Sequence, residues 1–288
     1  MEYNKIEELI DLAEKNNKDI SEIVLVVECE EKEKSKAEIW KEMKRTLAVM
    51  ENAAKKGRKN KKLSASGLSG GDAYRIDHSS IFPGSDLYQE VVTTALATAE
   101  VNADMGRIAA APTAGSSGIV PAVILSIGKK EDCSREELIS ALFTAAGLGR
   151  VVAGQATLAG AAGGCQAECG VGSAMAAGAA VELYGGSPTE VGNAFALALK
   201  NLLGLVCDPV AGLVEVPCVK RNGFAASHAL TAAGMALSGV ESVIPPDEVI
   251  EAMTQIGDLL PGSLKETSLA GLAATETGKN IESRLEQK

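Results

Sequence analysis

From residue 87 to about residue 239 the chain is rich in alanine and glycine and nearly free of charge over long runs. The alternating β-branched and aromatic residues that mark strands are almost absent from it. Aromatic residues make up only 3% of the whole chain, so small and aliphatic side chains must fill its interior and let helices approach closely. We therefore predict an all-α, compact helical domain with small-residue (Ala/Gly-rich) central helices.

The helical segments of this stretch follow from apolar periodicity and from Gly or Pro breaks. They are expected at residues 88–105, 120–127, 135–148, 171–183, 188–203 and 225–237. Helices without a polar face belong in the middle of a structure. We expect the core around residues 145–236, wrapped by amphipathic helices from both ends of the chain.

The N-terminal part is charged and has apolar residues at helical spacing over residues 21–56, with no Pro or Gly. Ser21 and the acidic residues near it predict a helix start. We separate these N-terminal charged helices, residues 1–62, from a second helical part, residues 63–288. The two are expected to form one continuous fold.

The distribution of charge along the chain argues against a nucleic acid or a membrane as a partner. The net charge is −10, and the dense basic run at residues 55–62 (KKGRKNKK) is typical of a solvated helix end, so we expect no nucleic acid partner. The uncharged stretches 108–128 and 151–167 contain Pro, hydroxyl or Gln residues, which favours burial in protein over a membrane. The N-terminus has no secretory pattern, so a cytoplasmic location with reduced thiols is expected.

Six cysteines are present, and Cys29 and Cys133 have the simplest interpretation, as incidental residues. The other four stand where glycine or proline interrupts apolar sequence: Cys165, Cys169, Cys207 and Cys218. Iron–sulfur ligands often occupy such breaks, because exposed backbone N–H groups surround the cluster there. The spacings match no compact zinc pattern, and taken alone they leave buried filler as an alternative.

Four segments together carry a resemblance to a known family: NADMGRIAAAPTAGSSGIVPAVIL (102–125), AGGCQAECG (162–170), LKNLLGLVCDPVAGLVEVPCVKRN (199–222) and KETSLAGLAATETG (265–278). With the loop SGLSGGDAYR (66–75), they closely resemble the α chain of iron–sulfur-dependent bacterial L-serine dehydratases. The resemblance implies a [4Fe–4S] cluster bound by Cys165, Cys207 and Cys218, with Cys169 as a rival ligand. Residues 63–288 would then form the iron–sulfur catalytic domain.

The reaction implied by this resemblance is the deamination of L-serine to pyruvate and ammonia, a step of amino acid catabolism that leads to gluconeogenesis. Breaking a Cα–H bond and expelling hydroxide calls for a Lewis acid on the hydroxyl oxygen, which is the role of the cluster. The resemblance also implies a separate β subunit and an oligomer.

The substrate carboxylate needs hydrogen-bond donors, and the loop at residues 112–118 (PTAGSSG) precedes an apolar run that starts at Ile119. Hydroxyls and free N–H groups at a helix start form an anion site, although simple capping explains the same residues. The resemblance favours substrate binding by Thr113, Ser116, Ser117 and Asn222. Arg221 also follows Cys218 closely enough to reach the site.

The proton acceptor is not identified by the sequence. The candidates in this chain are His228 and Lys220. A lone His on an Ala-rich helix is more often structural. The resemblance implies that the β subunit, which carries a Ser/His-rich motif in related enzymes, could supply the base.

Three other functions remain open. A pyridoxal-phosphate dehydratase would need a Schiff-base lysine, for which Lys200 is best placed, but the strands of its scaffold are missing. A non-catalytic helical subunit could hold a structural cluster. The same chemistry could also act on L-threonine or another hydroxy amino acid.

Overall fold

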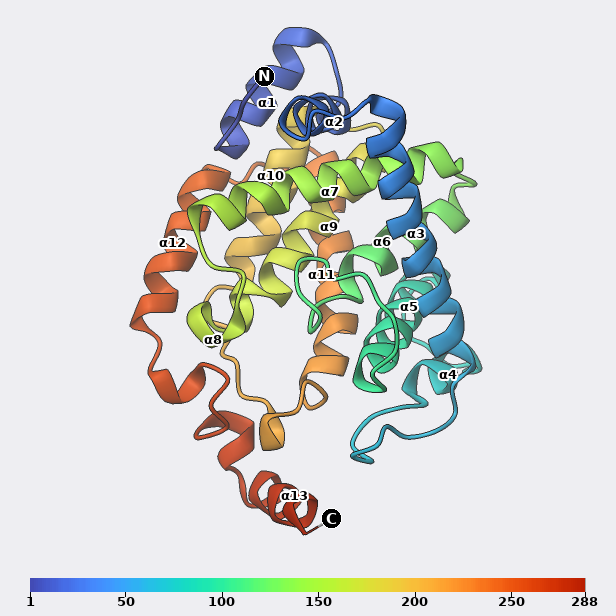
Figure 1. The fold of residues 1–288 in the computed structure, drawn as a ribbon, viewed down its shortest axis with the longest axis vertical. Helices are drawn as coiled ribbons and strands as arrows, with labels where there is room; N and C mark the ends of the chain where they lie inside the picture. Colours follow the sequence, from blue (N-terminus) through green and yellow to red (C-terminus); the bar gives the residue numbers. More distant parts are fainter. Residues whose placement is uncertain (288) are drawn as a thin grey trace.

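The computed structural model describes residues 1–287, and its regular structure is helical (Figure 1). Within that range there are thirteen α-helices and four short 3-10 helices, and the only β pairing is a single bridge between Cys207 and Lys265. The prediction of an all-α domain is confirmed. The α-helices are α1 (Ile6–Asn16), α2 (Ile20–Glu31), α3 (Lys36–Lys59), α4 (Asp72–Asp77), α5 (Asp86–Ala103), α6 (Ile119–Lys130), α7 (Arg135–Gln155), α8 (Gly160–Gly163), α9 (Cys169–Leu183), α10 (Pro188–Asn201), α11 (Cys218–Leu237), α12 (Pro246–Leu259) and α13 (Glu276–Glu286). The 3-10 helices are η1 (Cys165–Ala167), η2 (Val210–Gly212), η3 (Gly262–Leu264) and η4 (Gly271–Ala274).

Helix α9 is the centre of the molecule. Its residues from Cys169 to Val181 are all buried, and α6, α7, α10 and α11 pack around it. In Figure 1 it lies behind α7 and beside α11. A helix that is apolar on every face can only be stable when other helices surround it.

Small residues set the spacing of this core. A Cβ atom added at Gly178 of α9 would clash with the Leu148 side chain of α7, and one added at Gly149 of α7 would lie 2.8 Å from Met175 Cε of α9. Each helix therefore lets a large side chain of the other rest on a bare backbone. The low aromatic content is explained by this close helix packing.

The N-terminal segment differs from the prediction in its details. The periodic segment is broken into α2 and α3 at residues 32–35, where Glu33 adopts a left-handed φ of 50°. Ser35 then begins α3 with a reciprocal cap, since its N–H donates to Glu38 Oε2 at 2.9 Å. Asp19, two residues before the expected Ser21, stands at the start of α2.

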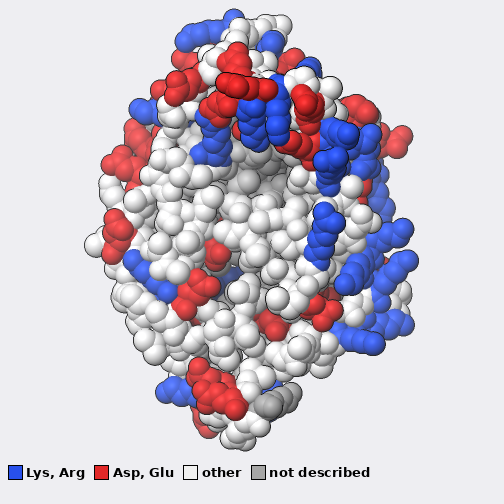
Figure 2. Space-filling model, in the orientation of Figure 1, with Lys and Arg blue, Asp and Glu red and all other residues white. Residues whose placement is uncertain are grey.

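Helix α7 is the one helix of residues 1–287 long and apolar enough to cross a bilayer by length and composition. It packs against α2 and α9, and most of its apolar residues are buried, as in a core helix. The face shown in Figure 2 carries most of its charges over the N-terminal helices and along α3, whereas the hollow in its upper middle is uncharged and a few acidic residues lie below it.

Candidate functional site

The segments singled out in the sequence meet at one place, where α8, the start of α11 and the stretch before α13 come together in the lower half of Figure 1. The N–H of Gln166 donates to Leu205 O at 3.0 Å, which joins the first cysteine loop to the second. The N–H of Glu266 donates to Cys207 O at 2.8 Å, which adds the C-terminal segment. Residues that are 100 positions apart in the chain thus lie together.

The four thiols lie at helix starts or in extended chain. Cys165 opens η1, Cys169 is the first residue of α9, and Cys218 is the first residue of α11. The sequence predicted a helix over residues 188–203, and α10 stops at Asn201, six residues before Cys207. The N–H of Cys207 donates to Leu264 O at 2.9 Å.

The pKa shifts of these thiols show that they are neighbours. A hydrogen bond from the Cys169 thiol lowers the pKa of Cys165, and the same bond raises the pKa of Cys169. Burial raises the pKa of Cys207, and burial raises that of Cys218 to about 12; negative charge on Cys165 adds to both shifts. The Cys207 and Cys218 thiols are therefore protonated until a cation binds them.

A single metal ion does not fit this donor set, since among residues 1–287 no three His, Cys, Asp or Glu side chains are placed to hold one. A cubane iron–sulfur cluster makes a different demand, because each thiolate binds a different iron atom. Three neighbouring thiols from separate segments of the chain are a donor set of that kind.

One guanidinium lies beside the thiols. Arg221, on the first turns of α11, lies close enough to Cys165 to lower the pKa of that thiol, and it donates to Val206 O and to Asp208 Oδ1, both at 2.9 Å. Asp208 in turn accepts the Leu272 N–H at 2.8 Å. The buried ion pair therefore fixes the loop that carries Cys207 against both α11 and the C-terminal segment.

The most significant residue that the sequence reasoning missed is Glu168, just before α9. Its Oε1 accepts the Thr113 hydroxyl at 2.9 Å. Burial raises the pKa of Glu168, and the carboxylate of Glu266 adds to that shift. A signal was present in the sequence, because Glu168 is the only charged residue between Arg150 and Glu182.

The loop at residues 112–118 leads into α6, as predicted, and lies against Glu168. The Thr113 Oγ1 is 3.0 Å from Ser116 Oγ, and Ser116 also accepts the Thr113 N–H at 3.3 Å. Both Ser116 and Ser117 are fully buried, and Ser117 Oγ has no hydrogen-bond partner within the described chain. Among the hydroxyl side chains of this loop, that of Thr113 is therefore the one that belongs to a partly exposed residue and lies next to a charged group, Glu168.

Asn222 is fully buried and its amide joins two segments. Its Oδ1 accepts the Gly118 N–H at 2.9 Å, while its Nδ2 donates to Gly115 O at 2.8 Å and to Cys218 O at 2.9 Å. These bonds hold the loop at residues 112–118 against the first turn of α11. The geometry favours a positioning role for Asn222 over contact with substrate.

The two base candidates make contacts elsewhere. His228 Nε2 lies 3.0 Å from Ala198 O and its Nδ1 lies 3.5 Å from Asn201 Nδ2, so the ring bridges α11 to α10. The Lys220 ammonium forms an ion pair with Asp72 at 2.7 Å. Lys200, the lysine considered for a pyridoxal cofactor, donates to the carbonyl and hydroxyl of Ser242.

The glycine-rich loop ahead of α4 touches the cysteine loop. The hydroxyls of Ser64 and Ser69 both donate to Glu215 Oε2, a buried carboxylate three residues before Cys218. The loop thus contacts the chain between the second and third cysteines of the predicted cluster site.

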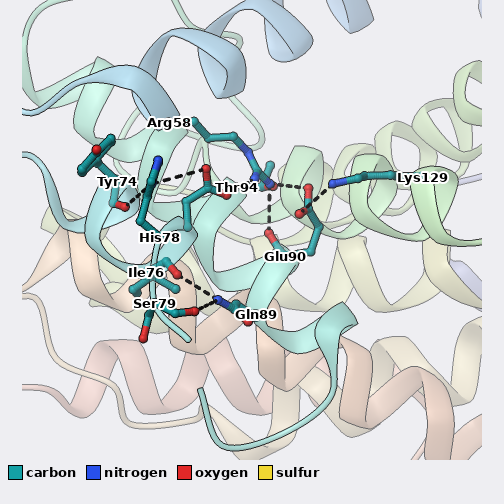
Figure 3. A network of polar contacts seen from close by, with 10 residues as sticks. Arg58, Tyr74, Ile76, His78, Ser79, Gln89, Glu90, Thr94 and Lys129 are labelled. Atoms are coloured by element: carbon teal, nitrogen blue, oxygen red, sulfur yellow. Dashed lines mark hydrogen bonds and ion pairs between the residues drawn. The ribbon is translucent and has the colours of Figure 1, made fainter. Parts of the chain in front are cut away.

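A cavity of about 680 Å³ lies away from the thiols, between α3, α4, α5 and α6. Figure 3 shows Arg58 donating to Glu90 and Thr94, and Lys129 forming an ion pair with Glu90 at 3.1 Å. Arg58 also donates to Asp77. Since these charges are matched within the protein, we interpret this network as one that holds α4 against α3 and α5.

The chain is similar in sequence to known proteins. A family model described as "Serine dehydratase alpha chain" matches residues 15–273. The chain is 48% identical to "Probable L-serine dehydratase, alpha chain" of Bacillus subtilis (strain 168), over 98% of this chain and 95% of that protein. It is 40% identical to "L-serine dehydratase, alpha chain" of Peptoniphilus asaccharolyticus, over 96% of each. It is 44% identical to "L-serine dehydratase TdcG" of Escherichia coli (strain K12), but over only 62% of this chain and 40% of that protein.

Proposed function

Because the chain belongs to the serine dehydratase alpha chain family, we propose that it is the α subunit of an L-serine dehydratase that deaminates L-serine to pyruvate and ammonia. In this proposal a separate β subunit completes the enzyme, a [4Fe–4S] cluster is its cofactor, and its location is the cytoplasm. The observation that carries the proposal is the proximity of the thiols of Cys165, Cys207 and Cys218 to one another and to Glu168, which accepts the Thr113 hydroxyl of the loop at residues 112–118.

The three cysteines would hold the cluster, and the chemistry of the donor set fits it. Thiolates are the usual ligands of iron–sulfur clusters, and the Arg221 guanidinium beside Cys165 offsets their negative charge. When bound, the cluster supplies Lewis acidity that stabilises the negative charge developing on the departing hydroxyl oxygen.

The loop at residues 112–118 supplies donors for the substrate carboxylate. Within the described chain, the N–H group of Gly115, a partly exposed residue, donates to no protein acceptor, whereas Ser116 is fully buried and the N–H of Gly118 is bonded to Asn222. Free backbone N–H groups just ahead of a helix are suited to bind a carboxylate. The hydrogen bonds of Thr113 to Ser116 and Glu168 hold this loop in its orientation.

The β subunit would supply the group that accepts the Cα proton. His228 and Lys220, the candidates in this chain, already have partners on α10 and α4, respectively. Enclosing the pocket with a second subunit would also exclude water, which strengthens the electrostatic interactions within it.

Iron reconstitution under anaerobic conditions tests the cluster assignment. We expect about four irons per chain, the content of one [4Fe–4S] cluster, with sulfide in equal amount. Cys207→Ala should lose most of this iron, whereas Cys29→Ala, a thiol on α2 away from the pocket, should retain it. Equal iron content in the two variants would contradict the ligand assignment.

A further inference from the structure

One carboxylate oxygen at the thiol pocket has no partner in the described chain. Glu168 Oε1 accepts the Thr113 hydroxyl at 2.9 Å, but no donor reaches Oε2. The Oε2 atom lies over the bare Cα of Gly160 together with Cys207 Sγ, since a Cβ atom built at Gly160 would be 2.5 Å from Oε2 and 2.9 Å from Sγ. The missing side chain at Gly160 thus brings an acceptor next to a proposed cluster ligand.

The charge at this oxygen is also unmatched. Among the described residues no Lys, Arg or His forms an ion pair with Glu168, and the charged neighbour that acts on it is a second carboxylate, Glu266. The guanidinium of Arg221 is hydrogen-bonded to Asp208 and acts electrostatically on Cys165. A half-buried carboxylate with a like charge beside it and no cation is unfavourable, and a cationic ligand removes that cost.

We propose that the Glu168 carboxylate binds the α-ammonium group of the substrate. This inference rests on the proposed function, in which the substrate is an α-amino acid with a β-hydroxyl group. Thr113 holds Oε1 and leaves Oε2 without a partner, while the N–H group of Gly115, a partly exposed residue, takes the carboxylate of the same molecule. Glu168 would therefore select amino acids over hydroxy acids that lack the amine.

The test uses the α chain with its β partner, loaded with iron anaerobically. Glu168→Gln is compared with wild type for kcat and KM with L-serine, and for calorimetric affinity toward 3-hydroxypropanoate, which keeps the hydroxyl and carboxylate but lacks the ammonium group. A hydrogen bond to a charged group contributes about 1.5–3 kcal/mol, so the KM of the variant should rise about 10- to 100-fold. Its affinity for 3-hydroxypropanoate should change less than about twofold, because that ligand has no group for Glu168 to bind.

The control is Glu168→Asp, which keeps the charge, so its KM for L-serine should lie between those of wild type and Glu168→Gln. Equal weakening of both ligands would overturn the proposal, as would an unchanged KM, including the case in which only kcat falls. Iron lost from Glu168→Gln alone would make Glu168 a cluster ligand and also overturn it. A wild-type protein without iron or without pyruvate formation would instead refute the proposed function, so the two failures are distinguishable.

Discussion

Replacing Asn222 with Ala separates a positioning role from a substrate-binding role. The change removes three hydrogen bonds, to Gly118 N–H, Gly115 O and Cys218 O, from a fully buried side chain. At about 1 kcal/mol for each bond, the free energy of unfolding should fall by about 3 kcal/mol. For a chain of this size, with an unfolding entropy of about 0.6 kcal/mol/K, that lowers the Tm by about 5 °C.

The same change should weaken iron retention, because the loop at residues 112–118 and the first turn of α11 lose their link beside Cys218. Thermal unfolding and iron content are measured on Asn222→Ala and on Ser227→Ala. Ser227 lies on the same helix, and its hydroxyl donates only to Gly223 O at 3.0 Å. The control should stay within about 0.5 kcal/mol of wild type. A stable, iron-loaded Asn222→Ala with a raised KM for L-serine would refute the reasoning and place Asn222 in contact with substrate.

Three further changes test other parts of the structure. Burial raises the pKa of Glu182 to about 7, so its stabilising contribution is complete below about pH 4.5 and is lost as the pH rises to 7. The free energy of unfolding of Glu182→Gln should therefore rise by about 2–3 kcal/mol relative to wild type between pH 5 and pH 8, as measured by urea unfolding at each pH. Arg221→Gln leaves Asp208 buried without its cation and should cost about 3–5 kcal/mol by the same assay, with iron released faster to a chelator. Gly178→Ala adds a methyl group against Leu148 and should lower the unfolding free energy by about 1–3 kcal/mol; an unchanged value would contradict the close packing of α7 on α9.

The sequence predicted the central helices well because their apolar residues run without interruption between glycine or proline breaks. Each expected segment between residues 88 and 237 overlaps one observed helix. The starts were less accurate: α11 begins at Cys218, seven residues before the expected start. The residues involved, CVKRNGF, look irregular as sequence, and only packing against α5 and α9 makes them helical.

The candidate site was predicted in part, because its cysteines and its PTAGSSG loop are contiguous motifs. Tertiary contacts between motifs could not be predicted from the same patterns. Nothing in the sequence pairs Glu168 with Thr113, or Asp208 with Arg221 across the turn that separates them. The division into residues 1–62 and residues 63–288 stays a prediction.

Pyruvate formation by the α chain together with its β partner tests the central claim most directly. The protein is loaded with iron anaerobically and assayed with L-serine and with L-threonine, alongside Cys207→Ala and Cys29→Ala. The account predicts iron-dependent pyruvate from L-serine that Cys207→Ala abolishes and Cys29→Ala preserves. Full iron loading without pyruvate, or turnover that survives Cys207→Ala, would contradict it.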